Sequence, residues 1–131
     1  MNGLQWFFYR VVTHLYPKLC GVPLGTFYNP DHVSIGVNTD IASNVVLATM
    51  THDIYNPTVH TGVKRIHIGD NCFIGANSVI LPGVVLGDNT IVGAGSVVTK
   101  SFPRGFVVIG GNPARVLKKI LSIGDEGVVV P

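Results

Sequence analysis

The sequence predicts an all-β fold, a single parallel β-solenoid wound from six-residue units that each form a short strand and a tight turn. Two observations predict it. The chain is rich in turn-forming residues, with 16 Gly and 8 Pro among 131 residues. Aliphatic residues also recur every six positions, in two runs. They are Ile35, Ile41 and Leu47, and then Ile68, Ile74, Ile80, Leu86, Val92 and Val98.

The six-residue unit also predicts where its side chains point. Alternate residues of a strand face opposite sides, so each aliphatic residue and the residue two positions before it face the interior. Most aliphatic residues are followed by Gly or another small residue, as expected where the backbone bends sharply. Six residues are too few for a helix and a strand. Three units per coil therefore build a triangular prism over residues 33–103.

One segment interrupts the repeat. Leu47 and Ile68 are 21 residues apart, so residues 53–65 form an irregular loop, in which Asn56-Pro57 is a typical turn. Insertions into solenoids commonly lie on the face used for binding. This loop is therefore where we expect the chemistry of the protein.

Length and composition exclude several classes of protein. A chain of 131 residues forms one domain, 1–131. Hydrophobic residues make up 47% and charged residues 12%, which excludes a disordered protein. The net charge of +2, without a long basic run, argues against a nucleic-acid partner. There is no run of about 18 apolar residues to span a membrane. Two cysteines form no disulfide framework, which favours the cytoplasm.

Short helices are expected at both ends of the solenoid. Residues 1–20 contain a helix, over 3–20, with aromatic and aliphatic residues along one side. It either docks on the first coil or makes peripheral contact with a membrane surface. At the other end, Asn112 as N-cap and Pro113 at the first helical position predict a capping helix over 112–121. That helix would cover strand edges that the last coil leaves exposed.

His52 opens the irregular loop and is the candidate catalytic base. An exposed imidazole can accept a proton near neutral pH, so His52 is suited to act as a general base. Asp53 could orient the imidazole as an acidic partner does in catalytic triads, or it could stabilise a turn. Asp40 is a second candidate partner. A reaction that forms an oxyanion would also need a hydrogen-bond donor such as a backbone N–H, which the sequence does not identify.

The repeat carries a family resemblance. The run IHIGDNCFIGANSVILPGVVLGDNTIVGAGSVVTK, preceded by THDIYNP and followed by GGNPARVLKKI, resembles the hexapeptide-repeat acetyltransferases. It is most similar to their sugar O-acetyltransferase branch, which includes maltose, galactoside and polysaccharide acetyltransferases. The match covers Val33 to Lys119. The resemblance implies a left-handed parallel β-helix, a homotrimer with active sites between subunits, and acetyl-CoA as the acetyl donor. It also implies that His52 is the catalytic histidine.

The same resemblance assigns residues to acetyl-CoA. Phe73 stands where relatives often carry a Trp that packs on the pantetheine arm. Cations near the phosphates suit the chemistry of the nucleotide. The other matched positions are Ala76 and Ala94 beside the pantetheine amides, Thr99 and Lys100 near the nucleotide, and Arg115 and Lys118 at the phosphates.

A zinc site is the alternative use of the histidines. Some left-handed β-helix proteins bind zinc through three histidines at subunit interfaces, and here His52, His60 and His67 are eight and seven residues apart. The short histidine pair of that family is absent. We therefore expect no metal, and interpret His60 as a loop residue and His67 as an outward-facing strand residue.

An apolar series on the outer walls favours an assembly. The residue between the two inward positions of each unit points outward, and in five units it is Phe73, Val79, Val85, Ile91 or Val97. Apolar residues repeated on adjacent coils indicate an interface between subunits.

We expect the protein to transfer an acetyl group from acetyl-CoA to a hydroxyl of a sugar or polysaccharide precursor. His52 acts as general base and the attack is direct, since no Ser or Cys nucleophile is paired with it. Two alternatives remain open. One is an N-acetyltransferase acting on an amino sugar or a nucleotide-linked amino sugar. The other is a non-enzymatic scaffold that keeps the fold.

Overall fold

The computed structural model describes residues 26–27 and 29–120 of the chain. The helix expected within residues 1–20 lies outside these ranges. Within them the chain forms strands β1 to β12 and one short 3-10 helix, η1 (Pro30–His32). The described part of the chain contains no helix long and apolar enough to cross a lipid bilayer.

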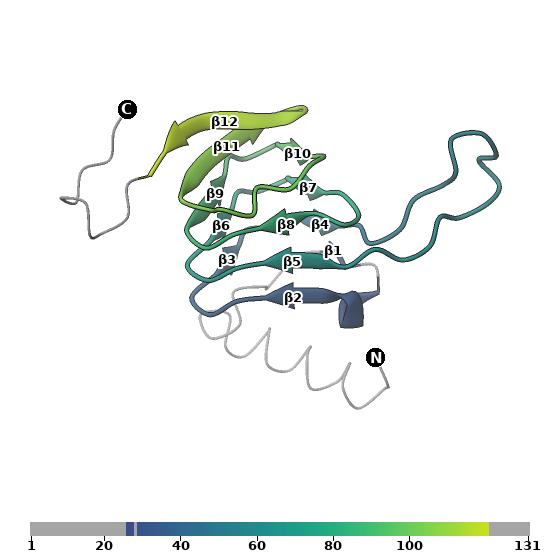
Figure 1. Ribbon diagram of the computed structural model, residues 1–131, viewed down its shortest axis with the longest axis horizontal. Helices are drawn as coiled ribbons and strands as arrows, with labels where there is room; N and C mark the ends of the chain where they lie inside the picture. The colour runs from purple at the N-terminus through teal and green to yellow at the C-terminus, as the bar shows by residue number, and fades with distance from the viewer. Residues whose placement is uncertain (1–25, 28, 121–131) are drawn as a thin grey trace.

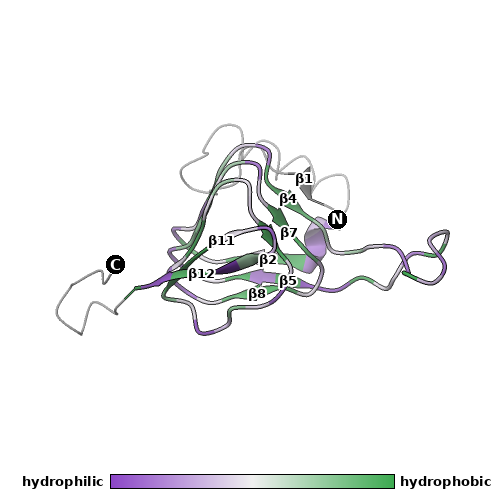
Figure 2. Cartoon of the chain, turned by 90° about the horizontal axis from the view of Figure 1, so that it is seen from above, coloured by the Kyte–Doolittle hydropathy of each residue, from purple (hydrophilic) through white to green (hydrophobic). Residues whose placement is uncertain are grey.

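The strands stack into three walls of a triangular prism (Figures 1 and 2). Wall A holds β1 (Thr26–Phe27), β4 (Val46–Leu47), β7 (Val79–Ile80) and β10 (Val97–Val98). Wall B holds β2 (Val33–Ile35), β5 (Ile66–Ile68) and β8 (Val85–Leu86). Wall C holds β3 (Asp40–Ile41), β6 (Phe73–Ile74), β9 (Thr90–Val92), β11 (Val107–Gly111) and β12 (Ala114–Lys119). Each coil passes through walls B, C and A in turn, so the expected all-β solenoid is confirmed.

The strands of the walls extend beyond the expected range of 33–103. β1 pairs in parallel with β4 below the first full coil. β11 pairs in parallel with β9 above the third coil. The repeat did not reveal these strands because they lie outside the run of regularly spaced aliphatic residues.

The interior follows the six-residue repeat. Eight of the nine repeating aliphatic residues are fully buried, and the ninth, Ile35, packs against the same core. The residues two positions earlier are buried as well, except the partly buried Val33, and four of them carry hydroxyl groups, Thr39, Ser78, Thr90 and Ser96. Their hydroxyls donate to backbone carbonyl oxygens, as in the 2.7 Å bond from Thr39 Oγ1 to the Gly69 carbonyl. Each buried hydroxyl thus has a partner, as a dry interior requires.

Asparagine residues occupy the sharp backbone turns at the corner between walls B and C. Asn38, Asn71 and Asn89 have φ of 54°, 54° and 55° at the corner between walls B and C. Asn is one of the few side chains that adopts this left-handed conformation readily. The glycines after the aliphatic residues serve close stacking instead. A Cβ on Gly75 would lie 2.5 Å from the backbone nitrogen of Ala94 in the next coil.

The capping helix expected over residues 112–121 is wrong for the residues that the structure describes. Residues 114–119 form β12, which pairs antiparallel with β11 through a turn at a cis Asn112-Pro113 peptide. Gly111, with φ of 99°, allows the chain to reverse there. Ala114 is the only buried residue of β12, and its other residues are exposed. A strand instead satisfies the open backbone edge of β11.

Candidate functional site

The segment between β4 and β5, residues 48–65, projects from the corner where walls A and B meet (Figures 1 and 2). We call this segment the finger. Its two halves run antiparallel and are joined by backbone hydrogen bonds. They are Lys64 N–H to Thr49 O at 2.8 Å, Thr61 N–H to Thr51 O at 2.7 Å, and Asp53 N–H to Val59 O at 2.8 Å. The loop expected to be irregular is therefore a hydrogen-bonded hairpin.

The tip of the finger is held by Asp53. Its Oδ1 accepts hydrogen bonds from the backbone N–H of Tyr55 at 2.8 Å and of Asn56 at 2.9 Å. The Asn56 carbonyl in turn accepts from the Val59 N–H at 2.9 Å, which closes the expected turn at Asn56-Pro57. Of the two interpretations of Asp53, this geometry is that of a turn-stabilising residue.

His52 lies in the outgoing half of the finger, and its imidazole is exposed. Its Nδ1 lies 2.7 Å from the carbonyl oxygen of Pro57. Because a carbonyl oxygen only accepts hydrogen bonds, Nδ1 carries the proton and Nε2 of the neutral ring has a free lone pair. The orienting group of His52 is thus a backbone carbonyl. Asp40 lies on wall C, away from the corner that carries the finger.

Wall C aligns two of the residues assigned to acetyl-CoA. Phe73 is opposite Ile91, Ile91 is opposite Val108, and Val108 is opposite Lys118. The four side chains therefore form one row across β6, β9, β11 and β12. Phe73 and Ile91 are 42% and 36% exposed. The row therefore begins with exposed apolar side chains and ends at the cation of Lys118.

The corner between walls C and A holds Ala76 and Ala94 in successive coils. The Ala76 carbonyl accepts a hydrogen bond from the Gly95 N–H at 2.8 Å. Ala94 is exposed, and within the described residues neither its N–H nor its carbonyl has a hydrogen-bond partner. Arg115 lies on β12, opposite Gly110, and its guanidinium donates to the Ala114 carbonyl at 3.1 Å.

Thr99 and Lys100 lie on the other side of wall A. They follow β10 at the corner between walls A and B, above the finger, and both are exposed. The Lys100 ammonium lies 5.7 Å from the centroid of the Phe102 ring, a cation–π contact. Within one chain, the expected site residues therefore lie in two separate groups. His52, Thr99 and Lys100 share one, and the residues of wall C and its corner share the other.

Comparisons with known proteins agree with this architecture. A family model described as the hexapeptide repeat of succinyl-transferase matches residues 65–100. Galactoside O-acetyltransferase of Escherichia coli K12 is 44% identical over 91 residues, which cover 67% of this chain and 44% of the relative. A maltose O-acetyltransferase from Clostridium difficile 630 superposes with a TM-score of 0.63 at 42% identity, over 69% of this chain and 49% of the other. The chain belongs to the hexapeptide-repeat acetyltransferase family.

A further family member was solved with coenzyme A. This galactoside acetyltransferase superposes with a TM-score of 0.63 at 32% identity, over 76% of this chain and 60% of the other. The chain spans about half the length of the curated relatives it matches.

The three histidines considered for zinc do not form one cluster. His52 and His60 are neighbours, with ring centroids 4.4 Å apart. His67 lies on β5, exposed as expected, and its Nδ1 is 2.6 Å from Ser34 Oγ on β2. Across residues 26–27 and 29–120, no three His, Cys, Asp or Glu side chains form a group that could hold a metal ion.

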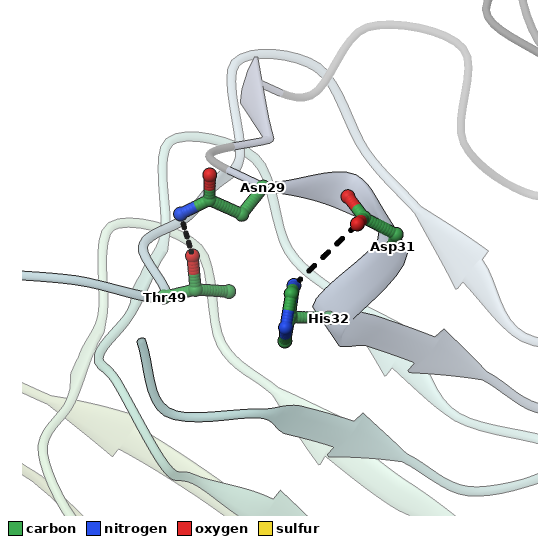
Figure 3. A network of polar contacts seen from close by, with 4 residues as sticks. All are labelled: Asn29, Asp31, His32 and Thr49. Atoms are coloured by element: carbon green, nitrogen blue, oxygen red, sulfur yellow. Dashed lines mark hydrogen bonds and ion pairs between the residues drawn. The ribbon is translucent and has the colours of Figure 1, made fainter. Parts of the chain in front are cut away.

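The root of the finger is tied to the coil below it (Figure 3). Asn29 Nδ2 donates to Thr49 Oγ1 at 3.2 Å, which links the start of η1 to the outgoing half of the finger. Asp31 and His32 form an ion pair of 3.7 Å beside it. A hydrogen bond to its own backbone lowers the pKa of the Asp31 carboxyl, and the charge of His32 adds to this effect. The hydrogen bond between Asn29 and Thr49 thus joins the finger to the prism.

The sequence did not assign two residues, Pro57 and His60, to the surroundings of the His52 ring. Pro57 acts through its carbonyl, which no side-chain pattern reveals. His60 reaches His52 only because the finger pairs in the register that places them opposite each other. A spacing of eight residues within a loop expected to be irregular does not predict this pairing.

Proposed function

We propose that the protein transfers an acetyl group from acetyl-CoA to a hydroxyl of a sugar or polysaccharide precursor, with His52 as general base. One observation carries this proposal. The 2.7 Å contact between His52 Nδ1 and the Pro57 carbonyl leaves Nε2 exposed as the proton acceptor. Relatives named for maltose and galactoside O-acetylation supply the expectation of a sugar acceptor.

The reaction follows from that nitrogen. Nε2 removes the proton of the acceptor hydroxyl as its oxygen attacks the thioester carbonyl. The tetrahedral intermediate then collapses, the carbon–sulfur bond breaks, and the proton on Nε2 passes to the departing thiolate of CoA. The Pro57 carbonyl stabilises the imidazolium that exists between these steps, because it accepts from Nδ1–H throughout.

The row on wall C is the proposed track for the pantetheine arm. Adjacent strands lie about 4.8 Å apart, so Phe73 and Lys118 are separated by roughly 14 Å, three strand spacings. An extended pantetheine arm bridges such a distance between the thioester and the pyrophosphate. Phe73 packs on the arm, the free backbone groups of Ala94 pair with an amide of the arm, and Lys118 with Arg115 meets the phosphates. Ala76, Thr99 and Lys100 complete the proposed set.

The active site requires a second copy of the chain. His52 lies at the corner between walls A and B, whereas the row lies on wall C of the same prism, so the base of one subunit serves acetyl-CoA held on the row of its neighbour. The exposed Phe73 and Ile91 side chains favour burial against another subunit. We propose a homotrimer with left-handed coils and sites between its subunits. A cytoplasmic location is consistent with Cys72, a free buried thiol.

His52→Ala tests the assignment of the base. With acetyl-CoA and a panel of maltose, methyl β-galactoside and glucosamine, thiol release should fall by about 10²- to 10⁴-fold in the variant. His67→Ala is the matched control. It removes a different exposed imidazole, which lies on β5, and should leave the rate unchanged. Unchanged turnover in His52→Ala with an acceptor that the unaltered protein acetylates would overturn the proposal.

The same panel separates the alternatives. A product that hydroxylamine cleaves is an ester, whereas a resistant product is the amide expected of an N-acetyltransferase. Absence of any binding of acetyl-CoA in calorimetry would favour a non-enzymatic scaffold instead.

If each active site takes residues from two subunits, two different inactive variants should restore activity when they assemble together. His52→Ala lacks the base, and the double variant Phe73→Ala, Arg115→Ala lacks the wall C contacts. Co-expressed in one cell, the two should form mixed assemblies in which some sites hold both sets of residues, and part of the activity should return. No recovery, with mixed assemblies demonstrated by mass spectrometry, would place both sets in one subunit.

A further inference from the structure

His60 faces His52 across the finger in a defined register. The backbone bonds Thr61 N–H to Thr51 O and Asp53 N–H to Val59 O flank this pair on either side. That pattern makes His52 and His60 a non-hydrogen-bonded antiparallel pair. In such a pair the two Cα atoms approach most closely and the side chains leave the ladder on the same face.

The two imidazole rings are in contact. Their centroids lie 4.4 Å apart and their planes are inclined at 59°. A tilted arrangement at this separation is a favoured geometry for two planar rings. His60 is therefore in ring contact with His52, while the Pro57 carbonyl lies at hydrogen-bond distance from the Nδ1 of His52.

Two contacts on different sides fix an imidazole better than one. The hydrogen bond to Pro57 sets the position of Nδ1 but still allows the ring to tilt about that contact. A second ring in contact with the imidazole limits this tilt, and thereby the direction in which Nε2 points. Within the described residues His60 has no hydrogen bond or ion pair of its own, so its imidazole is not committed to another partner.

We propose that His60 is a positioning residue for His52, acting by the packing of its ring. The proposal rests on the proposed function of His52 as the base. Small displacements of a reacting group cost catalysis far more than binding, because the geometry of attack is demanding. Loss of the His60 ring should therefore lower kcat, whereas acetyl-CoA, which the finger does not hold, should bind as before.

The experiment compares His60→Ala with His60→Phe. In thiol release from acetyl-CoA with maltose or methyl β-galactoside, His60→Ala should lower kcat roughly tenfold to a hundredfold. The KM for acetyl-CoA should stay within about twofold. His60→Phe keeps a flat ring at the same position and should recover most of the lost kcat. Val63→Ala, a truncation in the same returning half of the finger, is the matched control and should leave kcat unchanged.

A second readout needs no catalysis. Imidazole ¹⁵N NMR of the full chain should show His52 as the Nδ1–H tautomer in the unaltered protein and in His60→Phe. In His60→Ala the signal should shift toward a mixture of tautomers. This measurement separates the two proposals, since it can succeed even if no acceptor in the panel is acetylated.

Two results would overturn the inference. One is a His60→Ala variant with unchanged kcat and an unchanged His52 tautomer. The other is a His60→Phe variant as slow as His60→Ala, which would assign the effect to the nitrogens of His60 rather than to ring packing. If His52→Ala itself keeps full activity, the assignment of the base fails independently of the His60 result.

Discussion

The Nδ1 of His52 and the carbonyl oxygen of Pro57 lie 2.7 Å apart, so the tip of the finger folds back onto the imidazole that the finger carries. The orientation of the proposed base therefore depends on the turn that presents this carbonyl. That turn depends on Asp53, whose Oδ1 accepts the two backbone N–H groups at its start. Loss of a hydrogen bond in this turn should therefore lower the catalytic rate without changing the packing of the core.

Asp53→Ala should reduce kcat about tenfold, because the turn loosens and the carbonyl of Pro57 no longer stays on His52 Nδ1. Each lost hydrogen bond costs local stability of about 1 kcal/mol. The melting temperature should hardly change, since the tip of the finger contributes no residue to the hydrophobic core. Steady-state kinetics and a thermal melt of the same preparation provide both measurements.

Asp53→Asn distinguishes the turn from a catalytic triad. The amide keeps an Oδ1 that accepts the N–H groups of Tyr55 and Asn56, so activity should remain close to that of the unaltered protein. If Asp53 instead acted as a charged partner of the imidazole, Asp53→Asn would be as slow as Asp53→Ala. That outcome would refute the role assigned to the turn.

Thr61→Val should loosen the pairing between the two halves of the finger beside His52 and His60. Thr61 Oγ1 accepts from the Thr51 N–H at 3.1 Å and donates to the Thr51 carbonyl at 3.0 Å, and valine keeps the shape without the hydroxyl. The Thr51 N–H loses its partner, so its amide hydrogen should exchange faster and kcat should fall severalfold. Thr61→Ser keeps the hydroxyl and should behave normally. Equal exchange rates in the two variants would contradict this role.

Much of the fold could be predicted because one physical rule repeats through it. An aliphatic residue every six positions can be buried only if the chain coils, and Ile41, Ile74 and Val92 are indeed fully buried. The C-terminal hairpin was mistaken for a helix because Asn112-Pro113 begins helices as readily as turns. Residues 114–119 form a strand because they pair with the open edge of β11. That edge exists only once the coils are stacked, so the local sequence does not reveal it.

The candidate site was predictable only in part. His52 could be identified because it opens the one interruption of the repeat. The partner of its Nδ1 could not, because the Pro57 carbonyl is a backbone group placed by a turn. The division of the expected acetyl-CoA residues between two corners also depends on which wall each strand joins, and that requires the number of residues per coil to be known throughout.

Gly105→Ala should destabilise the last coil. Gly105 has φ of 66°, and a Cβ there would lie 1.9 Å from the Asp88 carbonyl oxygen in the coil below. Strain of this kind costs roughly 1–3 kcal/mol, and the backbone clash adds to it. Chemical denaturation should therefore show a clear fall in the free energy of unfolding. Gly62→Ala is the control, because a Cβ there meets nothing within 4 Å, and its stability should be unchanged.

Cys72 should resist alkylation in the folded protein. Its side chain is buried in the corner between walls B and C, where Sγ lies 3.3 Å from the Gly87 carbonyl oxygen. Burial raises the pKa of the Cys72 thiol, so less of the reactive thiolate forms at a given pH. In a Cys20→Ser background, iodoacetamide at pH 8 should modify Cys72 only after urea unfolds the chain. Rapid modification of the folded protein would show that the corner opens.

The same raised pKa predicts how stability depends on pH. The folded state holds the thiol proton more tightly than the unfolded chain, so the unfolded chain binds fewer protons above the ordinary thiol pKa of about 8.5. The contribution of Cys72 is therefore complete below that value and is lost as the pH rises toward and through the raised pKa. Between pH 7 and pH 10 the free energy of unfolding should fall more steeply for the unaltered protein than for Cys72→Ala. Equal slopes would mean that the thiol is no harder to ionise in the folded state, because every other titrating group is common to the two proteins.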